Sequence, residues 1–560
     1  MYLMCYNYRD MKTQAGYIIH KRSGKVQNKT KGTKNMKYRI NYDELSLKEK
    51  VMQTFVITIR EINKHGGPEE FFKKYKVGGM YYSESKDPDI ENRTEMSLRT
   101  YPKRLNECKK YSQIPLFICA DSTPLPGQTE RIESRSLGGT RSEKDAYNYG
   151  KLIGMQQNAN GVDWVLWPDI DMYFSRFMKM FATSDDPVLT AKLYRQVVRG
   201  IQDQGVCATV KHFPGLGTQT STNMHLAPGE NTLGLDEWLN SYGYVYSEMF
   251  KGNAACVMTT HITLASFDNE RHDGFYPIAT YSEKITKELL KNKLGFKGAV
   301  VTDALIMGGM ATGDLVKETV QAFKAGADWL LWPPIEAADA IAEAIESGEI
   351  PMSRLDDALS RIDKMRKLRE NALNNKSFDE PNADFANEIA KDITRRGICL
   401  RRNGVGLIPI GKETKKILIL SVTEKEDTTN LIRDAFEKKG FTCDVLTKIY
   451  DEEFNVCWQD DIDELQDKYD IVIFAVDTEQ KTWGDEMMMI WASHLFDKKK
   501  KIIVNFSSPF YADIMFPEDP TIIDVNADAF ETSINAVVDG IIGDMSFCGY
   551  PVVKDIKLIK

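Results

Sequence analysis

The sequence predicts an α/β fold, a (β/α)8 TIM-type barrel followed by a smaller α/β sandwich domain, and three observations lead to this. Short apolar runs alternate with helix-like stretches along the chain, as in a parallel sheet covered by helices. Several of the runs end in a charged or polar residue at the same point. With 560 residues the chain is also too long for one ordinary core.

Composition excludes several functional classes. The chain is 42% hydrophobic and 28% charged, which is typical of a folded soluble protein. Its 81 acidic and 73 basic residues give a net charge of -8, so no general surface for nucleic acid or an anionic membrane is expected. A neutral substrate fits this balance better. Nothing in the composition indicates an oligomeric state.

The cysteines point to a reducing compartment. The chain has nine of them, scattered, without CxxC spacing or a Cys/His pattern typical of a metal site. The N-terminus carries charges where a signal peptide needs an apolar run, and no stretch has the roughly eighteen apolar residues of a membrane helix. We therefore expect a cytoplasmic protein without a metal or an organic cofactor.

Changes of pattern divide the chain into four parts. Residues 1–40 are polar and basic and predict a flexible leader. Ser46, with Glu49 three residues later, forms a capping box that opens a helix and with it the barrel domain, residues 41–370. The polar residues 371–395 predict a linker. Residues 396–560 contain the buried-type runs KKILILSV, YDIVIFAV, KKIIVNFS and TIIDV, as in an open α/β sheet.

Polar residues mark the strand ends of the predicted barrel. Six runs predict its strands: PLFICAD, VDWVLWPDID, VCATVKH, ACVMTTH, GAVVTD and GADWLLWP. In a closed barrel the carboxyl ends of all strands meet at one face, where barrel enzymes place their chemistry. The residues expected on this rim are Asp121, Asp171, Lys211, His212, His261 and Asp303.

Two motifs resemble glycoside hydrolase family 3. KHFPGLG at 211–217 is similar to the family's KHFPGxG signature, and GFKGAVVTDALIMGGM at 295–310 is similar to its nucleophile segment. The resemblance extends from about Leu45 to Val553. It implies a barrel followed by an α/β domain, with Asp303 as catalytic nucleophile. It also implies a sugar subsite lined by the substrate-binding residues Asp121, Asp171, Lys211, His212 and His261.

The chemistry suits these residue types. A retaining glycosidase attacks the anomeric carbon with an ionised carboxylate while a second group protonates the leaving oxygen. Asp303 fits the first role, because a strand end holds it rigidly and the cationic Lys211 on the same rim favours its ionised form.

The acid/base departs from the family pattern. In the hexosaminidase-like branch the loop after KHFPGxG carries an Asp-x-His dyad whose histidine is the acid/base. Here that loop is TQTSTNMHLAP. Without a gap Thr222 and Met224 align with the dyad, whereas one inserted residue aligns Asn223 and His225, the alignment we favour. An asparagine orients an imidazole but does not stabilise its cation, so a weakened acid is expected.

Several functional alternatives stay open. The leading hypothesis is an exo-acting retaining β-glycosidase that removes a terminal sugar such as N-acetylhexosamine, with His225 as the second catalytic residue. A β-glucosidase-type variant would take its acid from the second domain, where Glu479 and Glu486 are candidates, and phosphorolysis is a third route. A sugar-binding protein with impaired catalysis competes with these. Two further differences from the family pattern favour this impaired sugar-binding protein. Phe181 stands where relatives carry an arginine, and STPLPG follows Asp121 in place of a glycine-rich acidic segment.

Overall fold

A computed structural model gives the structure of the chain. The residues that it describes are 38–82, 100–122, 128–174, 182–216, 224–272, 274–310, 313–375, 378, 382–423, 426–447, 459–478 and 490–554.

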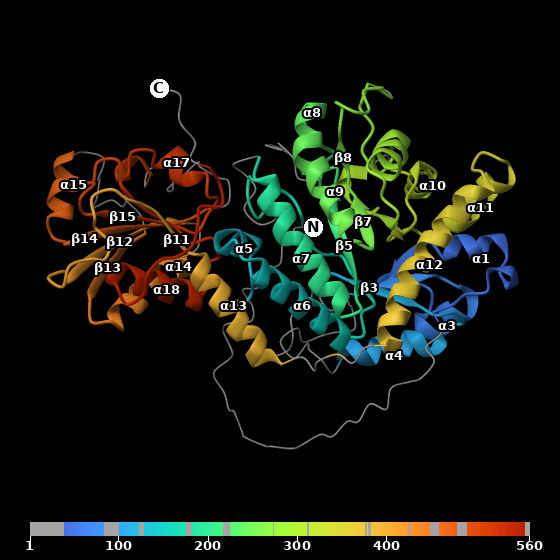
Figure 1. Cartoon of the computed structure of the whole chain (residues 1–560), viewed down its shortest axis with the longest axis horizontal. Coiled ribbons are helices and arrows are strands. Elements are labelled where there is room, and N and C mark those ends of the chain that lie inside the picture. Colours follow the sequence, from blue (N-terminus) through green and yellow to red (C-terminus); the bar gives the residue numbers. More distant parts are fainter. Residues whose placement is uncertain are drawn as a thin grey trace, which may run out of the picture.

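The first domain is a parallel eight-stranded barrel (Figure 1). All neighbouring strands are parallel, in the order β10-β1-β2-β3-β4-β5-β7-β9. A parallel bridge between Val301 and Trp329 joins the two ends of this sheet. The predicted barrel is therefore confirmed. Its strands are β1 (Phe55–Thr58), β2 (Gly79–Tyr81), β3 (Phe117–Ala120), β4 (Trp164–Val165), β5 (Cys207–Phe213), β7 (Cys256–Thr259), β9 (Ala299–Thr302) and β10 (Leu330–Leu331).

Helices lie between the strands and cover the barrel. The predicted capping box is present, because the Ser46 hydroxyl accepts from the Glu49 N–H while the Glu49 carboxylate accepts from the Ser46 N–H. The helical elements are η2 (Tyr42–Glu44), α1 (Leu47–Met52), α2 (Ile59–Lys64), α3 (Gly67–Lys74), α4 (Thr100–Tyr111), α5 (Ser134–Thr140), α6 (Glu143–Ala159), α7 (Pro187–Asp203), α8 (Leu235–Trp238), η4 (Leu239–Gly243), α9 (Tyr244–Lys251), η5 (Lys284–Lys293), η6 (Gly308–Met310), α10 (Leu315–Ala325), α11 (Ala337–Glu346) and α12 (Met352–Asn375).

Aromatic side chains fill the barrel interior. Phe117 stacks on Trp329 with ring centroids 6.2 Å apart, and Trp164 lies 5.4 Å from the same indole. All three rings are fully buried. The barrel is thus a packed core, and only its ends are available for chemistry.

A second domain follows, built on a six-stranded sheet ordered β11-β16-β15-β14-β12-β13. Only β11 among these is antiparallel to its neighbour. The predicted open α/β sheet is confirmed. Its elements are β11 (Cys399–Asn403), β12 (Lys416–Thr423), α14 (Glu426–Glu437), β13 (Thr442–Leu446), α15 (Gln459–Gln466), β14 (Ile471–Asp477), β15 (Lys501–Asn505), α17 (Tyr511–Met515), β16 (Thr521–Asp524) and α18 (Glu531–Ile542).

The connection between the domains is largely helical. The predicted linker, residues 371–395, contains the end of α12 and most of α13 (Ala383–Gly397), which Asn382 caps through its side chain. Figure 1 shows α13 running along the side of the second domain that faces the barrel. Most of the predicted leader, residues 1–37, lies outside the described residues.

Buried polar contacts hold the two domains together. Arg135 of α5 is 2% exposed and donates to the carbonyls of Phe506 and Ser507, just beyond β15. The same guanidinium pairs with Asp528 at 2.6 Å. The ring of Phe510 packs edge-on against Tyr173 at 5.9 Å. The carboxyl edge of the second sheet therefore lies against the barrel near the end of β4.

Candidate functional site

The structure places the predicted rim residues at the carboxyl ends of neighbouring barrel strands. Asp121 follows β3, Lys211 and His212 end β5 together with Phe213, and Asp303 directly follows β9. The remaining two lie in the extensions beyond their strands, Asp171 after β4 and His261 after β7.

Lys211 lies at the centre of a cluster of charged side chains that we call the floor of the site. The other members of the floor are Asp121, Asp169, Asp171 and His212. The Nζ of Lys211 is 3.5 Å from Asp121 Oδ1 and 3.7 Å from Asp169 Oδ1. The Tyr81 hydroxyl donates to the other oxygen of Asp121 at 2.6 Å. Burial acts to lower the pKa of Lys211, but the surrounding carboxylates of Asp169, Asp121 and Asp303 outweigh it and raise the pKa above its usual range. The lysine is therefore a permanent cation on this floor.

His212 continues the floor toward β4. Its Nδ1 lies 3.1 Å from Asp171 Oδ2, and the other oxygen of Asp171 accepts from the Leu216 N–H at 2.7 Å. Burial acts to lower the pKa of His212, but the hydrogen bond to Asp171 and the charge of Asp169 raise it overall. The imidazolium form is thus favoured, and Asp171 acts through His212 and the backbone.

Asp169 is a member of this floor that sequence reasoning missed. It is 1% exposed and pairs in parallel register with Lys211. Its Oδ1 makes no hydrogen bond to a described residue and lies 3.7 Å from His212 Nδ1. Burial raises the pKa of this carboxyl. A signal was available, because residues i and i+2 of an extended segment share a face, so Asp171 in WPDID implies Asp169 beside it.

Asp303 is held from both sides. The Thr260 hydroxyl donates to Oδ2 at 2.8 Å and the Ala304 N–H donates to Oδ1 at 2.8 Å, while the Asp303 N–H donates to the Thr259 carbonyl at 2.7 Å. Burial acts to raise the pKa of Asp303, but the charges of His261, His212 and Lys211 and the Ala304 N–H lower it overall. The result is a fixed, ionised carboxylate that is 9% exposed.

His261 supports the nucleophile loop. Its Nε2 lies 3.2 Å from the Ala304 carbonyl and its Nδ1 lies 3.0 Å from the Thr280 hydroxyl. The nitrogen that faces a carbonyl must carry a proton, so in the neutral ring Nδ1 accepts from Thr280, whereas in the imidazolium form it donates to Thr280. Burial lowers the pKa of His261. Both ring nitrogens thus contact protein groups, and the sugar contact expected of His261 stays a prediction.

His225 lies in the turn before β6 (Gly229–Glu230), against the loop that follows β9. It is half-buried, and its carbonyl accepts from the Gly308 N–H at 2.8 Å. This backbone contact places His225 beside the loop that follows Asp303. The other residues considered for the acid or the sugar contacts lie outside the described residues: Phe181, Thr222, Asn223, Glu479 and Glu486.

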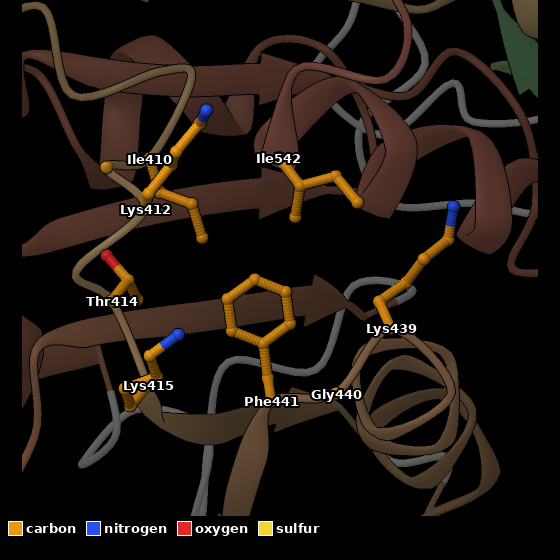
Figure 2. Close-up of a pocket in the computed structure, with 9 residues that line it drawn as sticks. Ile410, Lys412, Thr414, Lys415, Lys439, Gly440, Phe441 and Ile542 are labelled. Atoms are coloured by element: carbon orange, nitrogen blue, oxygen red, sulfur yellow. The ribbon is translucent and has the colours of Figure 1, made fainter.

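The pocket in Figure 2 is a different region. It has a volume of about 150 Å³ and lies at the amino edge of the second sheet, before β12 and β13. Phe441, Ile410 and Ile542 line it together with lysines. Lys439 is committed to ion pairs with Asp539 and Asp544 at 2.7 and 2.9 Å. Since the opposite edge of this sheet faces the barrel, the pocket plays no part in the rim site.

Two further searches concern metals and membranes. Among the described residues, no group of three or more His, Cys, Asp or Glu side chains is arranged to hold a metal ion. In the same part of the chain, each helix is too short or too polar to cross a membrane.

Comparison with known proteins identifies relatives of the barrel. The sequence profile of the glycosyl hydrolase family 3 N terminal domain matches residues 46–365. A beta-N-acetylglucosaminidase/beta-glucosidase of Cellulomonas fimi is 30% identical over 265 residues, 44% of this chain and 47% of the relative. Beta-hexosaminidase A of Pseudoalteromonas piscicida is 24% identical over 383 residues, 60% of this chain and 63% of the relative. The chain thus spans about half and about three fifths of these two curated relatives.

Solved structures match the whole architecture. A beta-glucoside phosphorylase superposes with a TM-score of 0.76 at 21% identity and covers 92% of this chain and 95% of its own. A glycoside hydrolase family 3 beta-N-acetylglucosaminidase from Paenibacillus sp. str. FPU-7 superposes with a TM-score of 0.72 at 22% identity. The match covers 92% of this chain and 100% of that structure. The profile match covers more than half of the chain, and the parallel barrel is consistent with it. The chain belongs to glycosyl hydrolase family 3.

Proposed function

We propose that the chain is a retaining exo-β-glycosidase that hydrolyses a terminal β-linked sugar through a covalent glycosyl-enzyme on Asp303. The observation that carries this proposal is the state of Asp303. Its two oxygens are fixed by Thr260 and Ala304, its pKa is lowered, and it stands on the same rim as the cationic Lys211, whose side chain is 12% exposed. A nucleophilic carboxylate needs this combination of charge and rigidity.

The reaction proceeds in two displacements. In the first, an Asp303 oxygen bonds to the anomeric carbon as the glycosidic C–O bond breaks, and His225 gives its proton to the leaving oxygen. In the second, His225 takes a proton from water, whose oxygen attacks the anomeric carbon and frees Asp303. His225 is half-buried, so it remains partly accessible from solvent, as both steps require.

The floor supplies the sugar subsite in this proposal. Asp121 accepts from sugar hydroxyls, while Lys211 and His212 donate to them. Asp171 fixes His212, which prepares one geometry before the sugar enters. Such a set of alternating charges suits a neutral, hydroxyl-rich ring.

The proposed sugar is an N-acetylhexosamine, with glucose as the alternative. The relative in Cellulomonas fimi is named for both activities, and the relative in Pseudoalteromonas piscicida is named a hexosaminidase. We also propose the cytoplasm as compartment, supported by the seven described cysteines, for which the structure shows no disulfide.

Phosphorolysis is a second candidate. One structural relative is named a beta-glucoside phosphorylase, and an imidazole does not repel an incoming phosphate as a carboxylate would. A catalytically impaired sugar-binding protein is the third. It would keep the floor but lack an effective acid, because Asn223 replaces the dyad aspartate in the favoured alignment.

A panel of p-nitrophenyl β-glycosides tests the proposal. Wild type and Asp303→Ala are assayed on the N-acetylglucosaminide, glucoside and xyloside, with and without phosphate. We expect turnover of at least one glycoside that Asp303→Ala abolishes. Acceleration by phosphate with release of a sugar phosphate would favour phosphorolysis. Sugar binding without turnover of any glycoside would favour the impaired binder.

A further inference from the structure

Two large apolar side chains stand exposed on the loops that carry the proposed catalytic residues. Leu226, next to His225, is 70% exposed, and Ile306, three residues after Asp303, is 57% exposed. Single exposed apolar residues are ordinary on protein surfaces. Here two of them lie on adjoining loops at the rim of one site, which is where an exposed apolar patch indicates binding.

Backbone contacts hold the two loops against each other. Besides the hydrogen bond from the Gly308 N–H to the His225 carbonyl, a Cβ on Gly308 would lie 2.5 Å from the Leu226 carbonyl oxygen. A Cβ on Gly309 would lie 2.5 Å from the Met224 carbonyl oxygen. The two glycines therefore permit a close approach of the two backbones that a side chain would block. Gly308, which contacts the Leu226 backbone, lies only two residues after Ile306 in the chain.

The exposure of Leu226 and Ile306 is not a consequence of loosely packed loops. Their neighbours Met224 and Met307 are each 5% exposed and belong to the same core cluster as Ala304. Each loop thus directs one apolar side chain into the barrel and leaves another at the surface. Exposing a leucine and an isoleucine on anchored loops forgoes the free energy that their burial would provide.

We propose that Leu226 and Ile306 form a binding site for an apolar leaving group, the aryl or alkyl aglycone of a β-glycoside. This inference rests on the proposed function, because it takes His225 as the group that protonates the leaving oxygen. That oxygen lies within hydrogen-bond reach of the acid. The aglycone bonded to it therefore extends over the turn that carries His225 and Leu226, and away from Asp303. A hydroxyl-rich leaving group would gain little from these side chains, whereas an apolar one would remove them from water.

Binding of non-hydrolysable S-glycosides tests the site without any need for turnover. The probes are the methyl, butyl and 4-hydroxybutyl thio-β-glycosides of N-acetylglucosamine and of glucose, measured by calorimetry. The wild type should bind the butyl compound roughly tenfold more tightly than the methyl compound, as partial burial of three methylenes predicts. The terminal hydroxyl of the third probe should remove most of this gain.

The double variant Leu226→Ser/Ile306→Ser should reduce the tenfold preference to about threefold or less while methyl glycoside affinity stays within about twofold. Val405→Ser, which alters an exposed apolar residue of the second domain, is the matched control and should keep the wild-type preference. Equal melting temperatures of the three proteins establish that the comparison concerns folded protein.

The outcomes separate this inference from the proposed function. An unchanged butyl preference in the double variant, or no preference in the wild type, overturns the apolar site even if glycosides are hydrolysed. A preference that the double variant loses supports the site, and if the same wild-type protein turns over no glycoside, the proposed hydrolysis is overturned alone. Absence of binding for all six probes overturns the site.

Discussion

The two sides of the rim differ in how firmly their groups are held. On the floor side, His212 and Asp171 are buried, the Lys211 side chain is 12% exposed, and ion pairs and hydrogen bonds join the three in one arrangement. On the acid side, His225 is half-buried and its loop is anchored through backbone contacts at Gly308. The floor and the nucleophile are therefore preorganised, whereas the acid depends on a loop.

This difference indicates which side chains should contribute most to catalysis. Preorganised charges stabilise the charge that develops in the transition state without any rearrangement of the protein. In many enzymes this is the largest contribution to the rate enhancement. A loop-borne acid contributes less and acts mainly when the leaving group is poor. We expect removal of the central cation of the floor, Lys211, to cost more activity than removal of the loop-borne acid, His225.

The largest effect is expected for Lys211→Met. It leaves Asp121 and Asp169 without their shared cation, so kcat/KM should fall by roughly 10³-fold and the free energy of unfolding by about 3 kcal/mol. Steady-state kinetics and urea denaturation measure the two quantities. Lys291→Met, which breaks the buried pair with Asp328 away from the rim, should lose similar stability while KM of the folded enzyme is unchanged. Equal kinetic losses in both variants would contradict a role for Lys211 in the subsite.

His225→Ala should have the next largest effect on activity, and the size of this effect should depend on the leaving group. Loss of the general acid should lower kcat/KM by roughly 10²-fold for alkyl glycosides and by less than about threefold for dinitrophenyl glycosides, whose leaving groups need no proton. A plot of rate against leaving-group pKa measures this. His272→Ala, at an exposed histidine, serves as control. Equal losses for both leaving groups would remove His225 from the acid role.

Thr260→Val should lower kcat by roughly tenfold and move the acid limb of the pH profile. A hydrogen bond to a carboxylate lowers its pKa, so loss of the Thr260 hydroxyl raises the pKa of Asp303. Asp303 acts in its ionised form, and activity should therefore disappear at a higher pH as the solution is acidified. Thr260→Ser should restore the wild-type profile. An unmoved limb in Thr260→Val would show that the hydroxyl does not tune the nucleophile.

Asp169→Asn should have the smallest effect. Because its carboxylate lies 3.7 Å from both Lys211 Nζ and His212 Nδ1, beyond hydrogen-bond distance, loss of its charge should change KM by less than about fivefold. Asp171→Asn should change it more, since that carboxylate contacts His212 directly and binds the Leu216 N–H. KM values of the two variants on one glycoside provide the test, and the reverse order would mean that Asp169 is the principal partner of His212.

The sequence predicted the barrel because its signal is local. Six strands appeared as apolar runs, and five of these runs end in polar residues that lie at a strand end or in the extension beyond it. The first two strands were not predicted. β1 begins three residues after α1 ends, so its apolar residues continue the helical pattern, and β2 spans only three residues. In the second domain β13 was missed, since its burial alternates like that of a half-exposed edge strand.

The site was predictable only in part, because the missing members are defined by tertiary contacts. Asp303 and Lys211 lie at strand ends and belong to recognisable sequence motifs. Thr260 is an ordinary threonine in the sequence, and only the adjacency of β7 and β9 brings its hydroxyl to Asp303. His261 illustrates the converse, since its strand-end position is as predicted but its ring nitrogens bond to Thr280 and Ala304.

The most direct test of the central claim is mass spectrometry of the protein after incubation with 2-deoxy-2-fluoro-β-glycosides that carry a dinitrophenyl leaving group. The account predicts that the wild type gains the mass of one fluorosugar on the peptide containing Asp303, and that Asp303→Asn gains none. A label on another carboxylate, or turnover without any adduct and with inversion at the anomeric carbon, would contradict Asp303 as the nucleophile.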